Sequence, residues 1–140
     1  MKKAVLTFMM IFWVLVSCSP SPRRTVQGFF NSLEKGELEK AYSYLAEDSE
    51  YEFRELLKTA IVYINNLGEE DAKRVRENIS REFAGMNLRI LDEKKISSRE
   101  AIVKIVYTQR NWRDQVVMDT SIVELHKIDN RWFIYRELMP

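Results

Sequence analysis

The chain has 140 residues, of which 31% are charged and 46% are hydrophobic. Its 22 basic and 21 acidic residues alternate along the chain, which argues against the basic stripe that nucleic-acid binding requires. The single cysteine excludes an intrachain disulfide, and the length predicts one domain with its own hydrophobic core. The sequence contains no residues at metal-ligand spacing, and we expect neither a metal nor a cofactor.

A hydrophobic segment follows a short basic start. Lys2 and Lys3 precede Ala4–Val16, which contain no charged residue. As a helix this segment would extend roughly 20 Å, which is less than the ~30 Å hydrocarbon layer of a bilayer. We therefore expect residues 1–17 to be a cleaved secretory signal peptide and not a transmembrane helix.

The end of this segment resembles the bacterial lipobox. Leu15, Val16 and Ser17 supply an aliphatic, a tolerated and a small residue directly before Cys18. The resemblance implies that Cys18 is acylated and becomes the mature N-terminus, with residues 18–24 as a lipidated tether. Two or more acyl chains anchor a protein durably, at about 0.8 kcal/mol per buried CH₂.

The lipid anchor implies a place and a first partner for the protein. We expect it on the extracytoplasmic side of a bacterial cell membrane, held to membrane lipid through Cys18. Because Ser19 and not Asp follows the cysteine, the resemblance favours the outer membrane if the host has one. The alternatives are a chance cysteine at an ordinary cleavage site, or a redox or catalytic thiol.

Helical spacing of apolar residues continues from the tether to Gly85. Thr25 is expected to cap the first helix, and Gly36 to end it. Ser49–Glu52 has the pattern of a capping box before the third helix. The four predicted helices carry the apolar faces Val26/Phe29/Phe30/Leu33, Leu38/Ala41/Tyr42/Leu45, Phe53/Leu56/Leu57/Ala60/Ile61/Ile64 and Ala72/Val75/Ile79/Phe83.

Beyond Gly85 the apolar period changes from helical to alternating. The predicted strands cover Met86–Leu91, Ala101–Tyr107, Gln115–His126 and Arg131–Leu138, with polar turns between them. Helices followed by antiparallel strands indicate an α+β domain, in which the helices pack on one face of a four-stranded meander.

Two stretches resemble the nuclear transport factor 2-like (cystatin-like cone) domains. Thr25–Asp48, TVQGFFNSLEKGELEKAYSYLAED, is similar to their two opening helices, and His126–Leu138, HKIDNRWFIYREL, to their last hairpin. The resemblance implies that residues 25–140 form a strongly curved sheet with helices across its concave face. One departure is the segment Ser49–Ala84, which predicts two helices where the family often has one.

In this family the cone can hold a small apolar ligand or a catalytic pair. We take Tyr42, Leu57, Tyr107, Asp119 and Trp132 as candidate pocket residues. Alternation places Asp119 on the face of Val117, Val123 and Leu125, where it could be an inward carboxylate. Because Ser121 shares that face, we favour the interpretation that the face is simply the solvated one. The single histidine, His126, is interpreted as a hairpin residue and not as a general base.

The sequence therefore predicts an envelope lipoprotein that binds a small apolar ligand or an envelope protein and is not an enzyme. The first alternative is proton-transfer chemistry of the isomerase or dehydratase type, with Asp119 as base beside Tyr42 or Tyr107. The second is a protein-interaction module with an exposed apolar patch around Val106, Met118 and Ile134.

Overall fold

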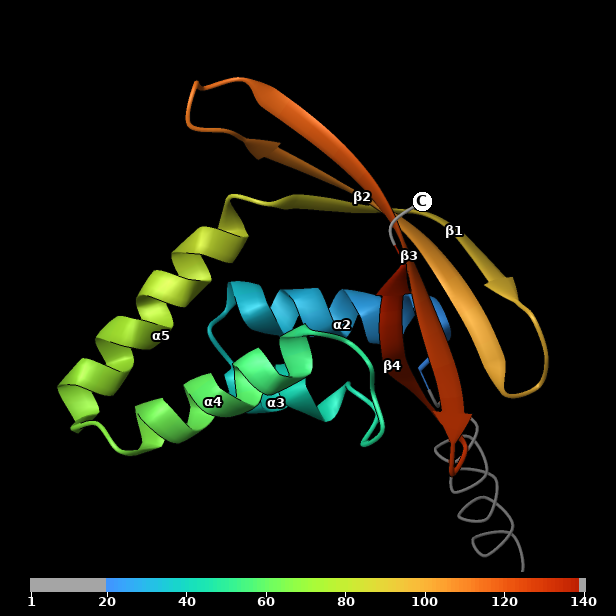
Figure 1. Cartoon of the computed structure of the whole chain (residues 1–140), viewed down its shortest axis with the longest axis horizontal. Coiled ribbons are helices and arrows are strands. Elements are labelled where there is room, and N and C mark those ends of the chain that lie inside the picture. Colours follow the sequence, from blue (N-terminus) through green and yellow to red (C-terminus); the bar gives the residue numbers. More distant parts are fainter. Residues whose placement is uncertain (1–19, 139–140) are drawn as a thin grey trace, which may run out of the picture.

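The computed structural model describes residues 20–138, so the predicted signal peptide and Cys18 lie outside the described residues. Within this range four helices precede four strands (Figure 1). The helices are α2 (Pro22–Glu34), α3 (Leu38–Ser43), α4 (Phe53–Asn65) and α5 (Glu69–Ala84). The strands are β1 (Asn87–Lys95), β2 (Glu100–Arg110), β3 (Val116–Ile128) and β4 (Arg131–Leu138).

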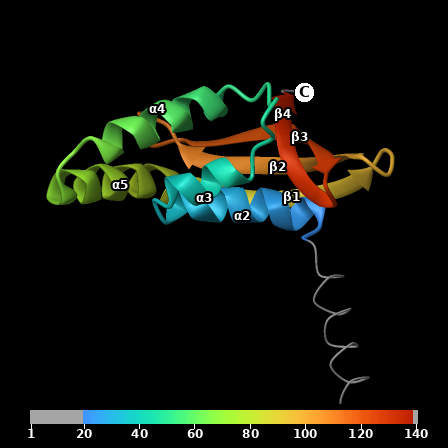
Figure 2. The ribbon, with the colours of Figure 1, turned by 90° about the horizontal axis from the view of Figure 1, so that it is seen from below.

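The strands form one antiparallel sheet in the order β1-β2-β3-β4. The sheet curves around α2 and α3, which lie on its concave side (Figures 1 and 2). The α4–α5 pair extends away from the sheet, and α5 leads back to β1 (Figure 1). The predicted α+β class and the two helices within Ser49–Ala84 are confirmed.

The hydrophobic core lies between α2 and the concave face of the sheet. Phe29 and Leu33 of α2 are fully buried, as are Ile105 of β2 and Leu125 of β3. No side chain of α5 is fully buried, although its apolar residues pack against the edge of this core. The core therefore fills the closed part of the cone.

The start of α2 differs from the expectation. Ser21 and not Thr25 is the N-cap, and its hydroxyl accepts a hydrogen bond from the Arg24 N–H at 3.3 Å. Pro22 at the first helical position favours this earlier start, because its fixed φ suits a helix and it has no N–H to satisfy. Thr25 is instead a buried helical residue, and Arg23 belongs to the helix and not to an extended tether.

The predicted capping box of α4 is also wrong. The Ser49 hydroxyl donates to the Tyr135 carbonyl at 2.7 Å and accepts from the Tyr51 N–H, so it fastens the loop before α4 to β4. The α4 N-cap, Glu52, makes no side-chain hydrogen bond. Ser49 therefore makes a long-range contact with β4 and does not cap the helix, as its local pattern predicted it would.

A β-bulge changes the facing of β4. Arg136 pairs with Glu124 and Ile134 pairs with Leu125, which leaves Tyr135 as an extra residue. Such an insertion reverses the inward and outward positions beyond it. Glu137 consequently lies opposite the inward-facing Val123, on the concave side of the sheet.

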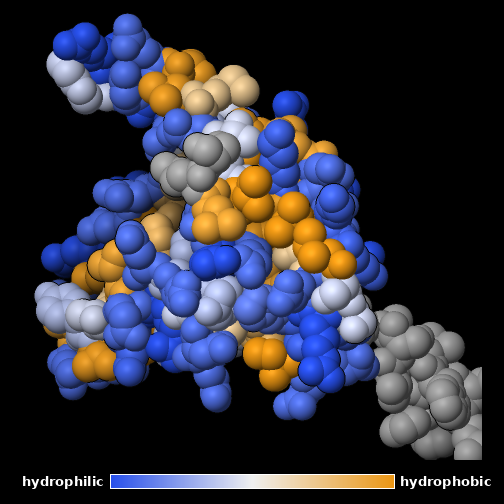
Figure 3. Space-filling model, turned by 45° about the vertical axis from the view of Figure 1, so that its right-hand side comes forward, coloured by the Kyte–Doolittle hydropathy of each residue, from blue (hydrophilic) through white to orange (hydrophobic). Residues whose placement is uncertain are grey.

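The predicted apolar patch on the outer face of the sheet is wrong for two of its three residues. Ile134 is 1% exposed because it pairs with the core residue Leu125, and Val106 is 4% exposed. Only Met118, at 64%, is exposed. The remaining outer-face apolar positions give a narrow hydrophobic band between hydrophilic side chains (Figure 3).

Candidate functional site

A cavity of about 230 Å³ lies at the open end of the cone, between the helices and the sheet. Its walls come from all the layers of the fold, which converge here beyond the filled core. The lining residues are Phe30, Leu33, Tyr51, Phe53, Phe83, Met86, Tyr107, Gln109, Asp119 and Glu137. None of these ten residues is basic.

Aromatic rings form most of the apolar wall. Phe30 of α2 meets Tyr107 of β2 edge to face, with ring centroids 5.7 Å apart. On the helical side, Phe53 stacks on Tyr51 at 5.4 Å and contacts Phe83 of α5 at 6.0 Å. Such ring pairs contribute about 0.5–1.5 kcal/mol each beyond their burial, so both sides of the cavity are held in place.

The polar groups of the cavity come from three neighbouring strands. Asp119 of β3 lies directly opposite Tyr107 of β2. The Tyr107 hydroxyl crosses the concave face and donates to Oε1 of Glu137 on β4 at 2.6 Å. This leaves the carboxylate of Asp119 as an acceptor for a bound molecule, whereas Glu137 also faces the Tyr51 hydroxyl.

The two tyrosines of the cavity are held in their neutral form. Burial, and then the negative charge of Glu137, raise the pKa of Tyr51 above its ordinary value. Burial and the hydrogen bond to Glu137 raise the pKa of Tyr107 in the same direction. Both hydroxyls are therefore donors at neutral pH, and they face a site whose formal charges are carboxylates.

The raised pKa of Tyr51 predicts a loss of stability at high pH. Above pH 10 the unfolded chain loses a tyrosine proton that the folded chain keeps, so the free energy of unfolding falls. We expect a fall of about 1.4 kcal/mol per pH unit from this residue. Urea unfolding at rising pH should show a slope that is shallower by this amount in Tyr51→Phe than in the wild type, because the raised pKa of Tyr107 leaves the variant with a slope of its own.

Below about pH 9 the free energies of unfolding of the wild type and of Tyr51→Phe should instead differ by a constant amount. In that range the Tyr51 phenol keeps its proton in both the folded and the unfolded chain. Parallel stability curves through the alkaline range would contradict the burial of the Tyr51 hydroxyl.

The structure brings two of the five candidate pocket residues to this cavity, namely Tyr107 and Asp119. Asp119 lies at the mouth, where its side chain is exposed. Leu57 and Trp132 are core residues that are 5% and 6% exposed and do not line the cavity. Tyr42 is half-buried on α3, with the Arg54 guanidinium 5.3 Å from its ring centre.

The interpretation that the Asp119 face is solvated holds at Asp119, which is exposed, and is wrong farther along β3. Ser121 is 0% exposed and Val123 is 2% exposed, so this is the core face. Sequence analysis missed Tyr51 and Glu137. Period-two counting places Glu137 outward, and only the bulge at Tyr135 brings it into the cavity.

His126 lies on the other face of the sheet and does not line the cavity. Its ring stacks on Tyr135 with centroids 4.0 Å apart, and Nε2 is 3.1 Å from Oε1 of Glu124. Although partial burial of Glu124 acts against it, hydrogen bonds from Arg136 and His126 lower the pKa of this carboxyl. This cluster ties β3 to β4 beside the bulge.

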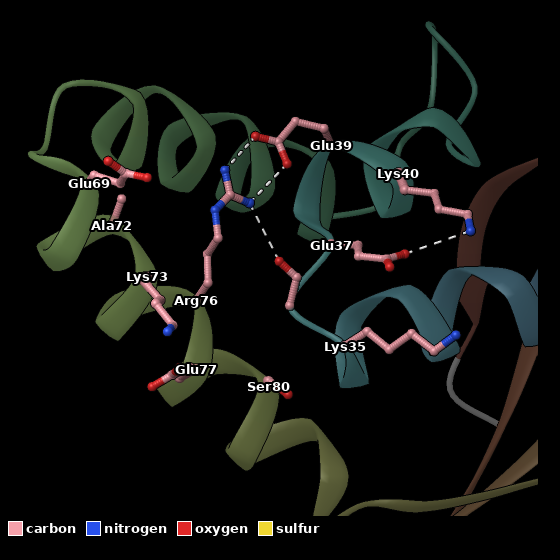
Figure 4. A pocket seen from close by; sticks show the side chains of 11 residues that line it. Lys35, Glu37, Glu39, Lys40, Glu69, Ala72, Lys73, Arg76, Glu77 and Ser80 are labelled. Atoms are coloured by element: carbon pink, nitrogen blue, oxygen red, sulfur yellow. Dashed lines mark hydrogen bonds and ion pairs between the residues drawn. The ribbon is translucent and has the colours of Figure 1, made fainter.

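A larger hollow of about 930 Å³ lies between α5 and the α2–α3 turn (Figure 4). Arg76 crosses it and forms a bidentate pair with Glu39 at 2.7 and 2.9 Å. Its guanidinium also donates to the Gly36 carbonyl, and the Ser80 hydroxyl donates to the Glu34 carbonyl. These bonds hold α5 against the turn, so we interpret the hollow as a structural contact.

Residues 20–138 contain no group of three His, Cys, Asp or Glu side chains that could hold a metal ion. In the same range, no helix combines the length and the apolar character needed to cross a bilayer.

Similar structures share the architecture at low sequence identity. A protein of unknown function with a cystatin-like fold from Nostoc punctiforme PCC 73102 is 14% identical, with a TM-score of 0.50 over 84% of this chain and 85% of the other. An NTF-2 like protein of unknown function from Shewanella oneidensis MR-1 is 13% identical, with a TM-score of 0.49 over 81% and 91%.

A ketosteroid isomerase-like protein from Erwinia carotovora atroseptica SCRI1043 is 12% identical, with a TM-score of 0.47 over 82% of this chain and 88% of the other. These likenesses concern the fold alone. No curated protein matches the sequence significantly. A family model described as "Domain of unknown function (DUF4878)" matches residues 16–135. The chain therefore belongs to the DUF4878 family and has the NTF2-like, cystatin-like fold.

Proposed function

We propose that this protein is a lipid-anchored protein of the bacterial cell envelope whose cone binds a small, mainly apolar ligand. We further propose that the ligand carries an ammonium or another hydrogen-bond-donating group. The observation that supports this most directly is the aromatic cavity in which Tyr107 donates to Glu137 and no lining residue is basic.

The charges of the cavity favour one kind of ligand over its opposite. Asp119 and Glu137 each present a carboxylate, and no Lys, Arg or His of the lining offsets them. A cation gains from both carboxylates and from the faces of the surrounding rings. A ligand carboxylate would instead meet like charges, offset only by the tyrosine hydroxyls and the Gln109 amide, so a fatty acid is a poor candidate.

The anchor rests on the sequence before the described residues. The hydrophobic segment, the lipobox and the absence of any second cysteine support acylation at Cys18. The outer membrane is the proposed location if the host has one. An anchored cone would keep its ligand, or an envelope protein that delivers it, close to the lipid surface.

A pair of probes with the same shape and opposite charge tests the ligand class. Phenethylamine and phenylacetate both fit the size of the cavity, and their binding can be followed by chemical-shift titration of the purified protein. We expect phenethylamine to bind about tenfold more tightly or better, which corresponds to about 1.4 kcal/mol. Equal affinity, or a preference for phenylacetate, would contradict the proposed ligand class.

Two variants sharpen this titration. Asp119→Asn removes one carboxylate at an exposed position and should reduce the preference for the amine without blocking the cavity. Met86→Trp places a large ring in the lining and should weaken both probes together. If neither variant changes binding, the probes bind elsewhere.

Proton-transfer catalysis is the second candidate, since Asp119 and Tyr107 share the cavity. A base that removes a proton from carbon benefits from a site without water, whereas the Asp119 side chain is exposed at the mouth. The catalytic alternative predicts Asp119-dependent exchange of an α-proton of a small ketone in D₂O. If the wild type exchanges this proton no faster than Asp119→Asn does, the catalytic alternative is contradicted.

A further inference from the structure

Three segments that are distant in the sequence meet at one end of the domain. They are residues 20–24 at the start of α2, residues 94–100 around the β1–β2 turn, and residues 127–131 around the β3–β4 turn. The Lys127 N–H donates to the Arg99 carbonyl at 2.8 Å, which joins the two turns. Both ribbon views place the start of α2 at this same end (Figures 1 and 2). We call these three segments the basic end.

The basic end concentrates positive charge in a domain that is close to neutral only as a whole. Only Glu100 and Asp129 are acidic within these segments, while Glu47 and Asp48 lie beside the second turn and line a hollow together with Ile128 and Arg131. The seven basic residues are Arg23 and Arg24 on α2, Lys94, Lys95 and Arg99 at the first turn, and Lys127 and Arg131 at the second. Each side chain of this set lacks an ion-pair partner among residues 20–138, whereas Arg54, Arg76, Arg110 and Arg136 elsewhere in that range are paired.

Two large apolar side chains project from the same end. Ile96 in the first turn is 54% exposed, and Ile128 beside the second is 40% exposed. Unpaired cations around exposed aliphatic groups are the combination that binds the interface of an anionic bilayer.

We propose that the basic end docks on an anionic lipid bilayer, with Ile96 and Ile128 in contact with the headgroup region. The inference rests on the proposed acylation of Cys18. Only Ser19 and Pro20 separate Cys18 from the α2 cap at Ser21, a contour of at most about 10 Å. A lipid attached at Cys18 would therefore hold the start of α2, and the two turns beside it, against the membrane surface.

The docked orientation has a consequence for the ligand site. The cavity lies toward α5, at the opposite end of α2 from the basic end. Glu69, Glu70 and Asp71 begin α5 and are partly offset by Lys73 and Arg74, so this far end lacks the net positive charge of the basic end. Anionic headgroups would attract the basic end and not this one, which fixes the cavity mouth away from the lipid.

The test uses the full-length protein isolated from its host and reconstituted into vesicles. Because Cys18 is the only cysteine and its thiol is consumed by acylation, an Ile128→Cys variant carries one reactive thiol for an environment-sensitive dye. A second variant, Ile96→Cys, guards against a local effect of the label. Trp112→Cys is the matched control, since Trp112 is 85% exposed in the distant β2–β3 turn.

Vesicles of phosphatidylcholine alone are compared with vesicles containing about one third phosphatidylglycerol, and mass spectrometry of each sample reports acylation. We expect the dye at residues 96 and 128 to shift to an apolar environment only in anionic vesicles, and salt to reverse the shift. The dye at residue 112 should remain in water in both. Reversing charge at Lys94, Lys95 and Arg99 to Glu should abolish the shift.

The control is the triple variant Lys58→Glu/Lys73→Glu/Arg74→Glu, which makes the same charge change at exposed, unpaired positions of α4 and α5. In this variant the dye should still shift to an apolar environment in anionic vesicles. If Cys18 is acylated and the dye stays in water in both vesicles, or is buried equally in both, the docking proposal fails while the anchor stands. If Cys18 carries no acyl mass, the anchor itself fails and the docking proposal with it. A shift caused by soluble polyglutamate but not by anionic vesicles would indicate an acidic protein partner and overturn the lipid assignment.

Discussion

Replacing Phe29 by alanine is expected to lower the free energy of unfolding by about 4 kcal/mol. Phe29 is 0% exposed at the centre of α2, between the helices and the sheet. Its ring meets Phe30 edge to face at 5.0 Å and Tyr51 at 5.9 Å, so it supports two residues of the cavity wall. Truncation removes the buried ring and leaves a void that the surrounding sheet can only partly close.

Urea unfolding followed by circular dichroism measures this change. Phe133→Ala is the matched control, because Phe133 is half-buried on the outer face of the sheet under the Arg131 guanidinium. We expect less than half the destabilisation from that variant. A loss of similar size at both positions would mean that the concave side of the sheet is not the principal core of the domain.

Periodicity predicted the elements of this fold because the faces are long and regular. The face of α5 and the alternation in β2 and β3 extend over many residues without interruption, and the structure has these elements near the predicted bounds. The first turn of each helix was harder to predict, since a helix cap depends on a single residue. Ser49 has the right spacing for a cap, yet its hydroxyl donates a hydrogen bond to the carbonyl of Tyr135, which is far away in the sequence.

The site shows the same division between regular and irregular structure. Tyr107 and Asp119 could be placed on the concave face because β2 and β3 pair without a bulge in that region. Glu137 could not be placed there, because the extra residue in β4 reverses which side chains of that strand face the core. The sequence held one signal of this bulge. Strict alternation would put Arg136 in the core beside Trp132 and Ile134, and an unpaired core arginine is a conflict that a bulge resolves.

Replacing Cys18 by serine is expected to abolish lipid attachment completely. A hydroxyl does not take the place of the thiol that the lipobox resemblance identifies as the acceptor of diacylglycerol. Without acylation, processing before residue 18 should fail as well, so the chain should retain residues 1–17. Because acyl chains contribute about 0.8 kcal/mol per buried CH₂, the wild type should require detergent for extraction from membranes.

Mass spectrometry of the N-terminal peptide measures both effects at once, through the acyl mass and the first residue of the chain. Ser17→Ala is the control, because it keeps a small residue before the cysteine and should be acylated like the wild type. The domain should unfold at the same urea concentration in all three proteins, since its core begins with α2 at Pro22. A wild-type chain recovered from membranes with an unmodified Cys18 would contradict the anchor, and the orientation proposed for the basic end would then have no physical cause.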